Sequence, residues 1–111
     1  MQSNNKLPEE LLAEIQKYAH SNPREETCGI IFEENKNYYF SPCRNMSSDR
    51  KKTFLIEPDV LLKKNIKYIY HSHVNNSCKP SNVDIANARN IMIPFLIYSL
   101  RDMDFNIYKC V

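Results

Sequence analysis

The sequence is poor in glycine and in net charge, and it lacks tryptophan. Its 111 residues include one glycine, no tryptophan and a formal net charge of +2. A charge so close to zero gives little long-range attraction to phosphate, so we expect no nucleic-acid partner. A chain of 111 residues is also too short for two hydrophobic cores, and we expect a single domain over residues 1–111.

Long apolar runs are missing as well. The longest, IMIPFLIYSL at residues 91–100, contains Pro94 and has about half the length that a bilayer requires, so we expect no membrane span. The N-terminal stretch MQSNNKLPEE lacks the apolar centre of a secretion signal. We therefore expect a soluble, cytoplasmic protein, unless it is built into a larger particle.

Cysteines are present but form no framework. Cys28, Cys43, Cys78 and Cys110 contain no CxxC pair, and without a secretion signal they are expected to be reduced thiols. Cys78 lies near two histidines in the sequence, so it is one alternative metal ligand.

Apolar periodicity predicts alternating helices and strands. Helices are expected at residues 8–20, 58–64 and 81–90. Strands are expected at residues 28–32, 37–43, 53–56, 66–70, 91–100 and 105–110. Of these, residues 66–70 run directly into the histidine motif, so His71 is expected at the C-terminal end of that strand. This order predicts an α/β fold in which one mixed β-sheet is sandwiched by helices.

The stretch YHSHVNNSCKPSNVD, residues 70–84, contains two of the three histidines. Residues two apart in a strand face the same side, so His71 and His73 can present their imidazoles together while Ser72 points away. Zinc hydrolases use three protein ligands and a water. Asp84 is the nearest strong candidate for the third ligand, because the intervening loop is long enough to turn back toward the strand end.

Two other interpretations of these residues remain open. Ser81 and Asp84 have the spacing of a capping box, in which Ser81 caps a helix and the carboxylate reaches back to its backbone. The histidines alone are also compatible with a polar strand end that binds nothing. The capping and ligand roles do not exclude each other.

The motif resembles the JAMM metalloprotease domain, also called MPN or JAB. That family combines an upstream glutamate with HSH, seven residues, Ser, two residues and Asp, which here are residues 71–73, 74–80, 81 and 84. The upstream PREETCGIIF places Glu26 two residues before Cys28, as the family pattern requires. Pro23 lies one residue further from Cys28 than that pattern has it, which makes Glu25 a near miss. An exposed loop acid is the competing interpretation of Glu26.

The resemblance implies a JAB/MPN, cytidine-deaminase-like fold and a Zn²⁺ ion held by His71, His73 and Asp84. Glu26 would be the general base, and Ser81 would donate a hydrogen bond to the developing oxyanion. The implied activity is hydrolysis of a peptide or isopeptide bond. A nucleobase deaminase would instead need HxE and PCxxC, which are absent.

The resemblance covers nearly the whole chain and is strongest with small prokaryotic JAB proteins and the JAB domain of the phage tail assembly protein K family. The segment after residue 42 is similar to the asparagine loop of the family. Val74 stands where many members have proline, and the insertions with which deubiquitinases grip ubiquitin are missing.

The partners implied by this family are a ubiquitin-like tail, a sulfur-carrier conjugate, a cell-wall peptide or a phage tail protein. If a phage encodes the chain, the expected location is the host cytoplasm or the virion. The alternative function is a catalytically silent JAB scaffold in a phage tail or another assembly.

Overall fold

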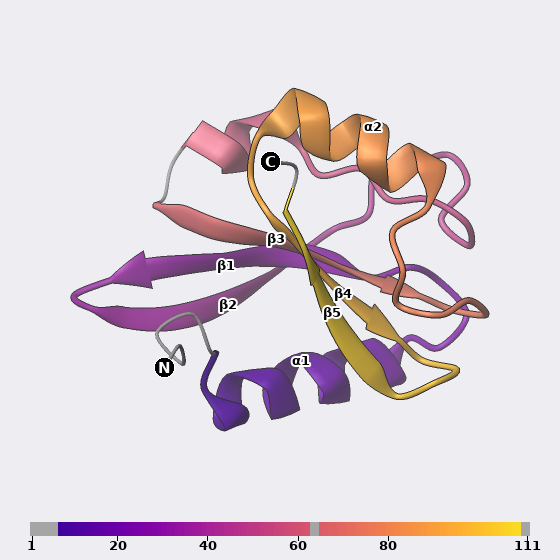
Figure 1. The fold of residues 1–111 in the computed structure, drawn as a ribbon, viewed down its shortest axis with the longest axis horizontal. Coiled ribbons are helices and arrows are strands. Elements are labelled where there is room, and N and C mark those ends of the chain that lie inside the picture. The colour runs from indigo at the N-terminus through magenta and orange to yellow at the C-terminus, as the bar shows by residue number, and fades with distance from the viewer. Residues whose placement is uncertain (1–6, 63–64, 110–111) are drawn as a thin grey trace.

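A computed structural model describes residues 7–62 and 65–109. Five strands form one sheet in the order β2-β1-β3-β4-β5 (Figure 1). Only β3 and β4 pair in parallel, and the other neighbouring strands are antiparallel. The strands are β1 (Cys28–Glu34), β2 (Asn37–Cys43), β3 (Ile66–His73), β4 (Phe95–Ser99) and β5 (Asp104–Tyr108).

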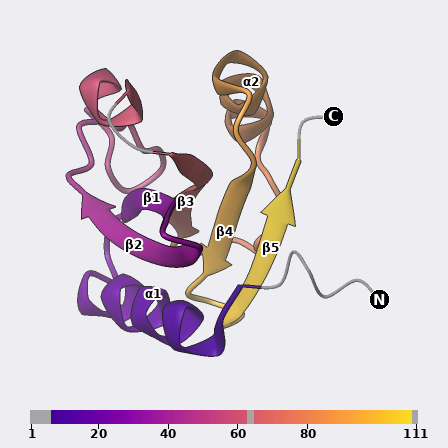
Figure 2. The ribbon, with the colours of Figure 1, turned by 90° about the vertical axis from the view of Figure 1, so that its left-hand side faces the viewer.

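Helices cover both faces of this twisted sheet. The helix α1 (Glu9–Ser21) lies on one face, and α2 (Asn82–Ile91) and the short 3-10 helix η2 (Pro58–Leu62) lie on the other, as Figures 1 and 2 show. The predicted α/β fold with a mixed sheet between helices is therefore confirmed. None of the helices in the described residues is both long enough and apolar enough to cross a bilayer.

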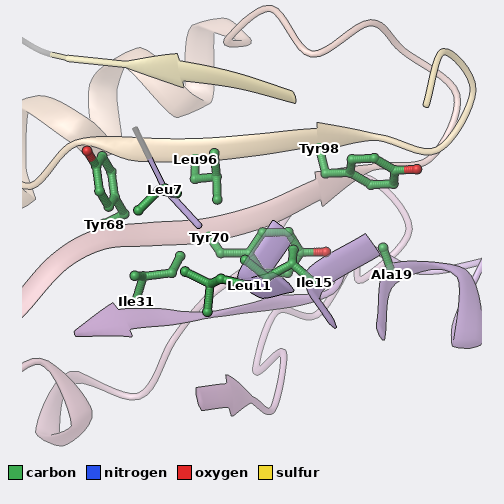
Figure 3. Close-up of a cluster of buried hydrophobic side chains, with 9 residues drawn as sticks. All are labelled: Leu7, Leu11, Ile15, Ala19, Ile31, Tyr68, Tyr70, Leu96 and Tyr98. Atoms are coloured by element: carbon green, nitrogen blue, oxygen red, sulfur yellow. The ribbon is translucent and has the colours of Figure 1, made fainter. Parts of the chain in front are cut away.

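The helix α1 seals its face with a stripe of apolar residues. Leu11, Ile15 and Ala19 recur every four residues and are buried, and the acidic Glu9 and Glu10 occupy the first turn, where the helix dipole favours negative charge. The stripe packs on side chains from β1, β3 and β4 (Figure 3). The members of this cluster are Leu7, Leu11, Ile15, Ala19, Ile31, Tyr68, Tyr70, Leu96 and Tyr98.

The hairpin of β1 and β2 brings two backbones unusually close. Its two-residue turn places Asn35 and Lys36 at φ 53° and 69°, as a type I′ turn requires. Further along, a Cβ atom on Gly29 would lie 2.6 Å from the Ser41 carbonyl oxygen, so only glycine fits there.

Three predicted elements differ from the structure. Residues 53–56 form no strand, because their backbone bonds the side chain of Asn45 and the amide of Met46 instead of a neighbouring strand. Of the predicted helix 58–64, residues 58–62 form η2, while 63–64 lie outside the described residues. In the predicted strand 91–100, Ile91 ends α2 and the left-handed Met92 caps it, so β4 begins only at Phe95.

Other element boundaries shift by a few residues. The strand β3 continues through His71 to His73, and β1 extends to Glu34. The final strand is β5, and the last predicted position, Cys110, lies outside the described residues.

Candidate metal centre

The central strand β3 presents both histidines to the α2 face of the sheet. His71 is 0% exposed and His73 is 4% exposed. Strand alternation puts Ser72, which is also buried, on the opposite face with Tyr70. The predicted orientation of the pair therefore follows from the register of β3 between β1 and β4.

Asp84 reaches the same point from the first turn of α2. Its carboxylate oxygens Oδ1 and Oδ2 each lie 3.0 Å from a histidine nitrogen, Nε2 of His71 and Nε2 of His73 respectively. Oδ2 also accepts the Ser81 N–H at 2.9 Å, while Ser81 Oγ accepts the Asp84 N–H at 3.1 Å. The predicted capping box is thus present, and it aims the carboxylate at the histidines.

The three side chains suit a metal ion. One ligand atom from each of His71, His73 and Asp84 lies within 4.8 Å of the other two. His71 Nε2 makes no directed hydrogen bond although Asp84 is near, and such an orphaned nitrogen in a fully buried ring is costly unless a cation uses its lone pair. Two imidazoles and one carboxylate form a common zinc ligand set.

Contacts behind the histidines fix their orientation. The Nδ1–H of His73 donates to the Ser77 carbonyl at 2.7 Å, which leaves Nε2 unprotonated and facing Asp84 in the neutral ring. The ring of His71 is held by packing: it stacks on Phe54 with centroids 4.3 Å apart and meets the edge of Phe95 at 5.4 Å.

The loop between His73 and Ser81 is held by the β4–β5 hairpin. Side chains of that hairpin bond its backbone carbonyls, and together with His73 they engage a run of four consecutive carbonyl groups. The bonds run from Arg101 to Asn75 at 3.1 Å, Ser99 to Asn76 at 2.6 Å, His73 to Ser77 at 2.7 Å and Asn106 to Cys78 at 3.1 Å. The loop is therefore anchored although Val74 replaces the common proline.

Glu26 is a buried acid whose pKa is influenced by His73 and Asp84. It is 7% exposed, so the interpretation as an exposed loop acid is wrong. Burial raises its pKa to about 8, with His73 lowering the pKa and Asp84 raising it. The neighbouring Glu25 is about half exposed and pairs with Arg50 at 3.5 Å. Glu26 is therefore buried close enough to His73 and Asp84 for both to influence its pKa.

The surroundings shift the pKa values of the three proposed ligands in different directions. Burial lowers the pKa of His71 and keeps its ring neutral. Burial also lowers the pKa of His73, but Asp84 and the Ser77 carbonyl outweigh it and raise the pKa above its ordinary value. Burial raises the pKa of Asp84, but the proximity of His71 and His73 and the hydrogen bond from the Ser81 N–H bring it well below its usual range. Asp84 is therefore a carboxylate at any physiological pH.

Asn45 is a residue to which the sequence alone assigned no role. Its side-chain amide donates to the carbonyls of Glu26 at 2.8 Å and Thr53 at 2.9 Å, and its oxygen accepts from Ser47 and Leu55. The similarity of this segment to the asparagine loop of the JAMM family was the available signal. Buried Asn45 ties the loop to the backbone of Glu26.

Ser81 and Cys78 lie at the margin of the centre. Ser81 is exposed, and because its oxygen accepts the capping bond, its O–H hydrogen remains available to a bound molecule. The thiol of Cys78 is not among the grouped ligand atoms in the described residues. The structure thus gives no support to Cys78 as an alternative ligand.

An open cleft lies on the same face of the sheet. It has a volume of about 440 Å³ and is lined mainly by β2 and the residues that follow it. Cys28 pairs across strands with both Cys43 and His71, so the Cys43 wall of the cleft is two strands from the histidines, or about 10 Å. The lining residues are Ile30, Ser41, Pro42, Cys43, Arg44, Met46, Glu57 and Val60.

Comparisons with known proteins agree with this geometry. The profile of one family, prokaryotic homologs of the JAB domain, matches residues 8–110. Tail tip assembly protein K of Escherichia phage N15 is 26% identical over 94 residues, or 81% of this chain. The chain spans 39% of the length of that curated relative.

Solved structures share the fold at low sequence identity. A protein from Desulfitobacterium hafniense matches with a TM-score of 0.71 at 19% identity, covering 91% of this chain and 79% of that one. A JAB1/MPN domain protein from Archaeoglobus fulgidus matches with a TM-score of 0.55 at 19% identity, covering 90% and 82%. These likenesses show that the fold is of the JAB/MPN type.

Proposed function

Since this chain belongs to the prokaryotic JAB family, we propose that it is a zinc-dependent metallopeptidase that hydrolyses a peptide or isopeptide bond. The observation that carries the proposal is the buried convergence of His71, His73 and Asp84 beside a buried glutamate. Hydrolysis by a metal-activated water needs ligands that hold the ion and a nearby acid or base that moves the proton of the water.

His71, His73 and Asp84 would hold the ion. Zinc, when bound, would polarise the scissile carbonyl and lower the pKa of a water to about 7. A cation at this place would also lower the pKa of Glu26 from about 8, because it stabilises the carboxylate. Glu26 would then be ionised near neutral pH and able to act as a base.

In this proposal Glu26 transfers the proton and Ser81 stabilises the developing oxyanion. Glu26 accepts a proton from the attacking water and returns it to the leaving amine, so the proton count balances over the cycle. Ser81 turns its free O–H hydrogen toward the oxygen that becomes negative in the transition state. Asp84 stays ionised throughout because its pKa is well below its usual range.

The substrate proposed for this site is a protein or peptide. The cleft beside β2 offers apolar walls from Ile30, Met46 and Val60 to side chains flanking the scissile bond. Ubiquitin-like tails, sulfur-carrier conjugates, cell-wall peptides and phage tail proteins are the candidate classes. The similarity to a tail tip assembly protein favours testing the last class first.

The proposal is tested by measuring zinc and turnover in the same preparations. We expect about one zinc per chain, lost in His71→Ala or His73→Ala. Glu26→Gln should keep its zinc and lose about 10²–10⁴-fold in kcat on a cleaved tail protein or reporter peptide. Equal turnover by wild type and Glu26→Gln would contradict the role of Glu26, and wild type that binds no zinc would contradict the proposal as a whole.

A silent structural role is the second candidate. It is favoured by the similarity to a protein named for tail tip assembly. In that case the zinc-loaded chain would form a stable complex with a tail protein and cleave none of the candidate substrates. Cleavage that depends on Glu26 would exclude this alternative.

A further inference from the structure

Three hydroxyl groups form a buried network behind the histidines, on the α1 face of the sheet. Thr27 Oγ1 lies 2.6 Å from Tyr70 Oη and donates to Ser72 Oγ at 3.1 Å. Thr27 is 6% exposed, and Tyr70 and Ser72 are 0% exposed. Tyr70 belongs to the cluster drawn in Figure 3, which excludes water from the network.

The network joins the two segments that carry the proposed chemistry. Thr27 directly follows Glu26, and Ser72 stands between His71 and His73. The Thr27 N–H donates to Ser72 Oγ at 2.8 Å, and the Ser72 N–H donates to the Thr27 carbonyl at 2.9 Å. These two bonds lie one position beyond the last pair of the β1–β3 ladder, Cys28 with His71.

The Ser72 side chain replaces a backbone acceptor at this position. In a regular antiparallel ladder, a pair that exchanges both bonds would use the Ser72 carbonyl to accept the Thr27 N–H. Here the Ser72 hydroxyl accepts the Thr27 N–H instead. Regular pairing of β1 with β3 therefore ends at Cys28, and Glu26 lies outside the ladder. At this position a side chain thus stands in for one backbone carbonyl in joining the segment of Glu26 and Thr27 to β3, and that side chain also accepts a bond from Thr27 Oγ1.

We propose that Ser72 is a positioning residue, whose hydroxyl, held by Thr27 and Tyr70, fixes Glu26 at its working distance from the histidines. The inference rests on the proposed function, in which Glu26 is the base. The remaining bonds of Glu26 are consistent with this role: its N–H donates to the Arg50 carbonyl at 2.7 Å, and its carbonyl accepts from Asn45. Arg50 and Asn45 belong to a loop, whereas Ser72 belongs to the central strand and bonds Thr27, the residue that directly follows the base.

The decisive variant is Ser72→Ala, compared with Ser72→Thr, which restores the hydroxyl. Ser72→Ala should lower kcat by about 10–100-fold with KM changed much less, because a displacement of the base near 1 Å is enough for such a loss. Its zinc content should remain at the wild-type value, since no ligand is touched. Ser72→Thr should recover most of kcat.

Tyr98→Phe is the matched control for a purely structural effect. It also removes a buried hydroxyl from the α1 face, where Tyr98 Oη bonds Gln16 and His20 and has no link to Glu26. Tyr98→Phe should lower the melting temperature and leave kcat unchanged. If Ser72→Ala keeps the wild-type kcat, or loses zinc and activity together, the proposal is wrong.

A readout without turnover separates this inference from the proposed function. The Glu26 amide bonds Arg50 and not Ser72, so its hydrogen exchange reports loosening of the whole segment. In zinc-loaded Ser72→Ala the Glu26 amide should exchange about tenfold or more faster than in wild type, and Ser72→Thr should restore protection.

The outcomes for the two proposals are distinct. If zinc-loaded wild type cleaves nothing, the proposed function fails. Unchanged exchange at the Glu26 amide in Ser72→Ala would overturn the positioning role by itself. If Ser72→Ala and Ser72→Thr both fail to fold, Thr27→Val against Thr27→Ser repeats the test, and equal exchange in those two overturns it.

Discussion

The two faces of the sheet carry different kinds of residue, although the same strands supply both. On β3, Tyr68, Tyr70 and Ser72 point toward α1, while Ile69, His71 and His73 point toward α2. The α1 face is covered by one regular helix over a continuous apolar cluster. The α2 face is covered by a shorter helix, η2 and loops, and it holds the buried pair of histidines with Asp84 and the open cleft.

This difference indicates that the α1 face mainly stabilises the fold, while the α2 face carries the groups of the candidate site. A regular helix can bury apolar surface efficiently but presents few groups to a ligand, whereas loops and helix ends supply the polar atoms of a site. The hydroxyl network of Thr27, Tyr70 and Ser72 is the exception, because on our proposal it serves the chemistry from the α1 face.

The largest effect is expected from shortening a core side chain on the α1 face. Ile15→Ala removes a fully buried side chain and should lower the free energy of unfolding by about 2–5 kcal/mol, with zinc binding of the folded protein unchanged. Denaturant unfolding and zinc titration measure the two quantities. Leu62→Ala, at a position 84% exposed, is the control and should cost little. Weaker zinc binding in folded Ile15→Ala would contradict the division between faces.

On the α2 face, removal of a charge should stabilise the metal-free chain. Burial raises the pKa of Glu26 from 4.5 to about 8, so the stability it contributes is fully present below pH 4.5 and is lost as pH rises through 8. Glu26→Gln is uncharged at every pH and should therefore exceed wild type by about 2–5 kcal/mol above pH 8, with the gap closing below pH 4.5. Denaturant unfolding over this pH range, with a chelator present, measures the gap.

Glu25→Gln is the matched control for that experiment, because it neutralises the adjacent, half-exposed carboxylate. A pH-dependent gap of equal size in Glu25→Gln would show that the effect comes from net charge and not from burial at Glu26.

A smaller effect is expected from the hairpin that holds the ligand loop. Asn106→Ala frees the Cys78 carbonyl and should weaken zinc binding by about tenfold, at the low end for partners behind the ligands. Competition with a chromogenic chelator measures the affinity. Asn37→Ala, which removes an exposed amide from the other hairpin, should leave it unchanged. Equal affinities for the two variants would show that the loop needs no support from β5.

The smallest effect is expected at Cys78. Since its thiol is not among the grouped ligand atoms of the described residues, Cys78→Ala should bind zinc at the same stoichiometry and within about twofold of the wild-type affinity. The same chelator competition applies. A loss of the zinc would restore the thiol to the ligand set.

Much of the fold could be predicted because its signals are local. The four-residue spacing of Leu11, Ile15 and Ala19 predicted α1, and the two-residue spacing of the histidines predicted their common face. The approach of Asp84 could also be foreseen, because the capping-box spacing marks the helix start that carries it. Each of these patterns lies within one element or its immediate flank.

The features that could not be predicted depend on contacts between distant residues. Segment 53–56 has β-forming residues but bonds Asn45, so local propensity was misleading there. The bonds from Thr27 to Ser72 exist only because β1 and β3 pair in one particular register. The support of the ligand loop by Ser99 and Asn106 likewise requires the β4–β5 hairpin to be in place.

The parallel pairing of β3 and β4 has a consequence for chirality. The chain passes from β3 through α2 to β4, and such crossovers are almost always right-handed because of the twist that L-amino acids impose on strands. The handedness decides which face of the sheet receives α2 and with it Asp84. A left-handed connection would place Asp84 above Tyr70 and leave both imidazoles on the far side. The convergence of His71, His73 and Asp84 therefore depends on the stereochemistry of the backbone as much as on the identity of the three residues.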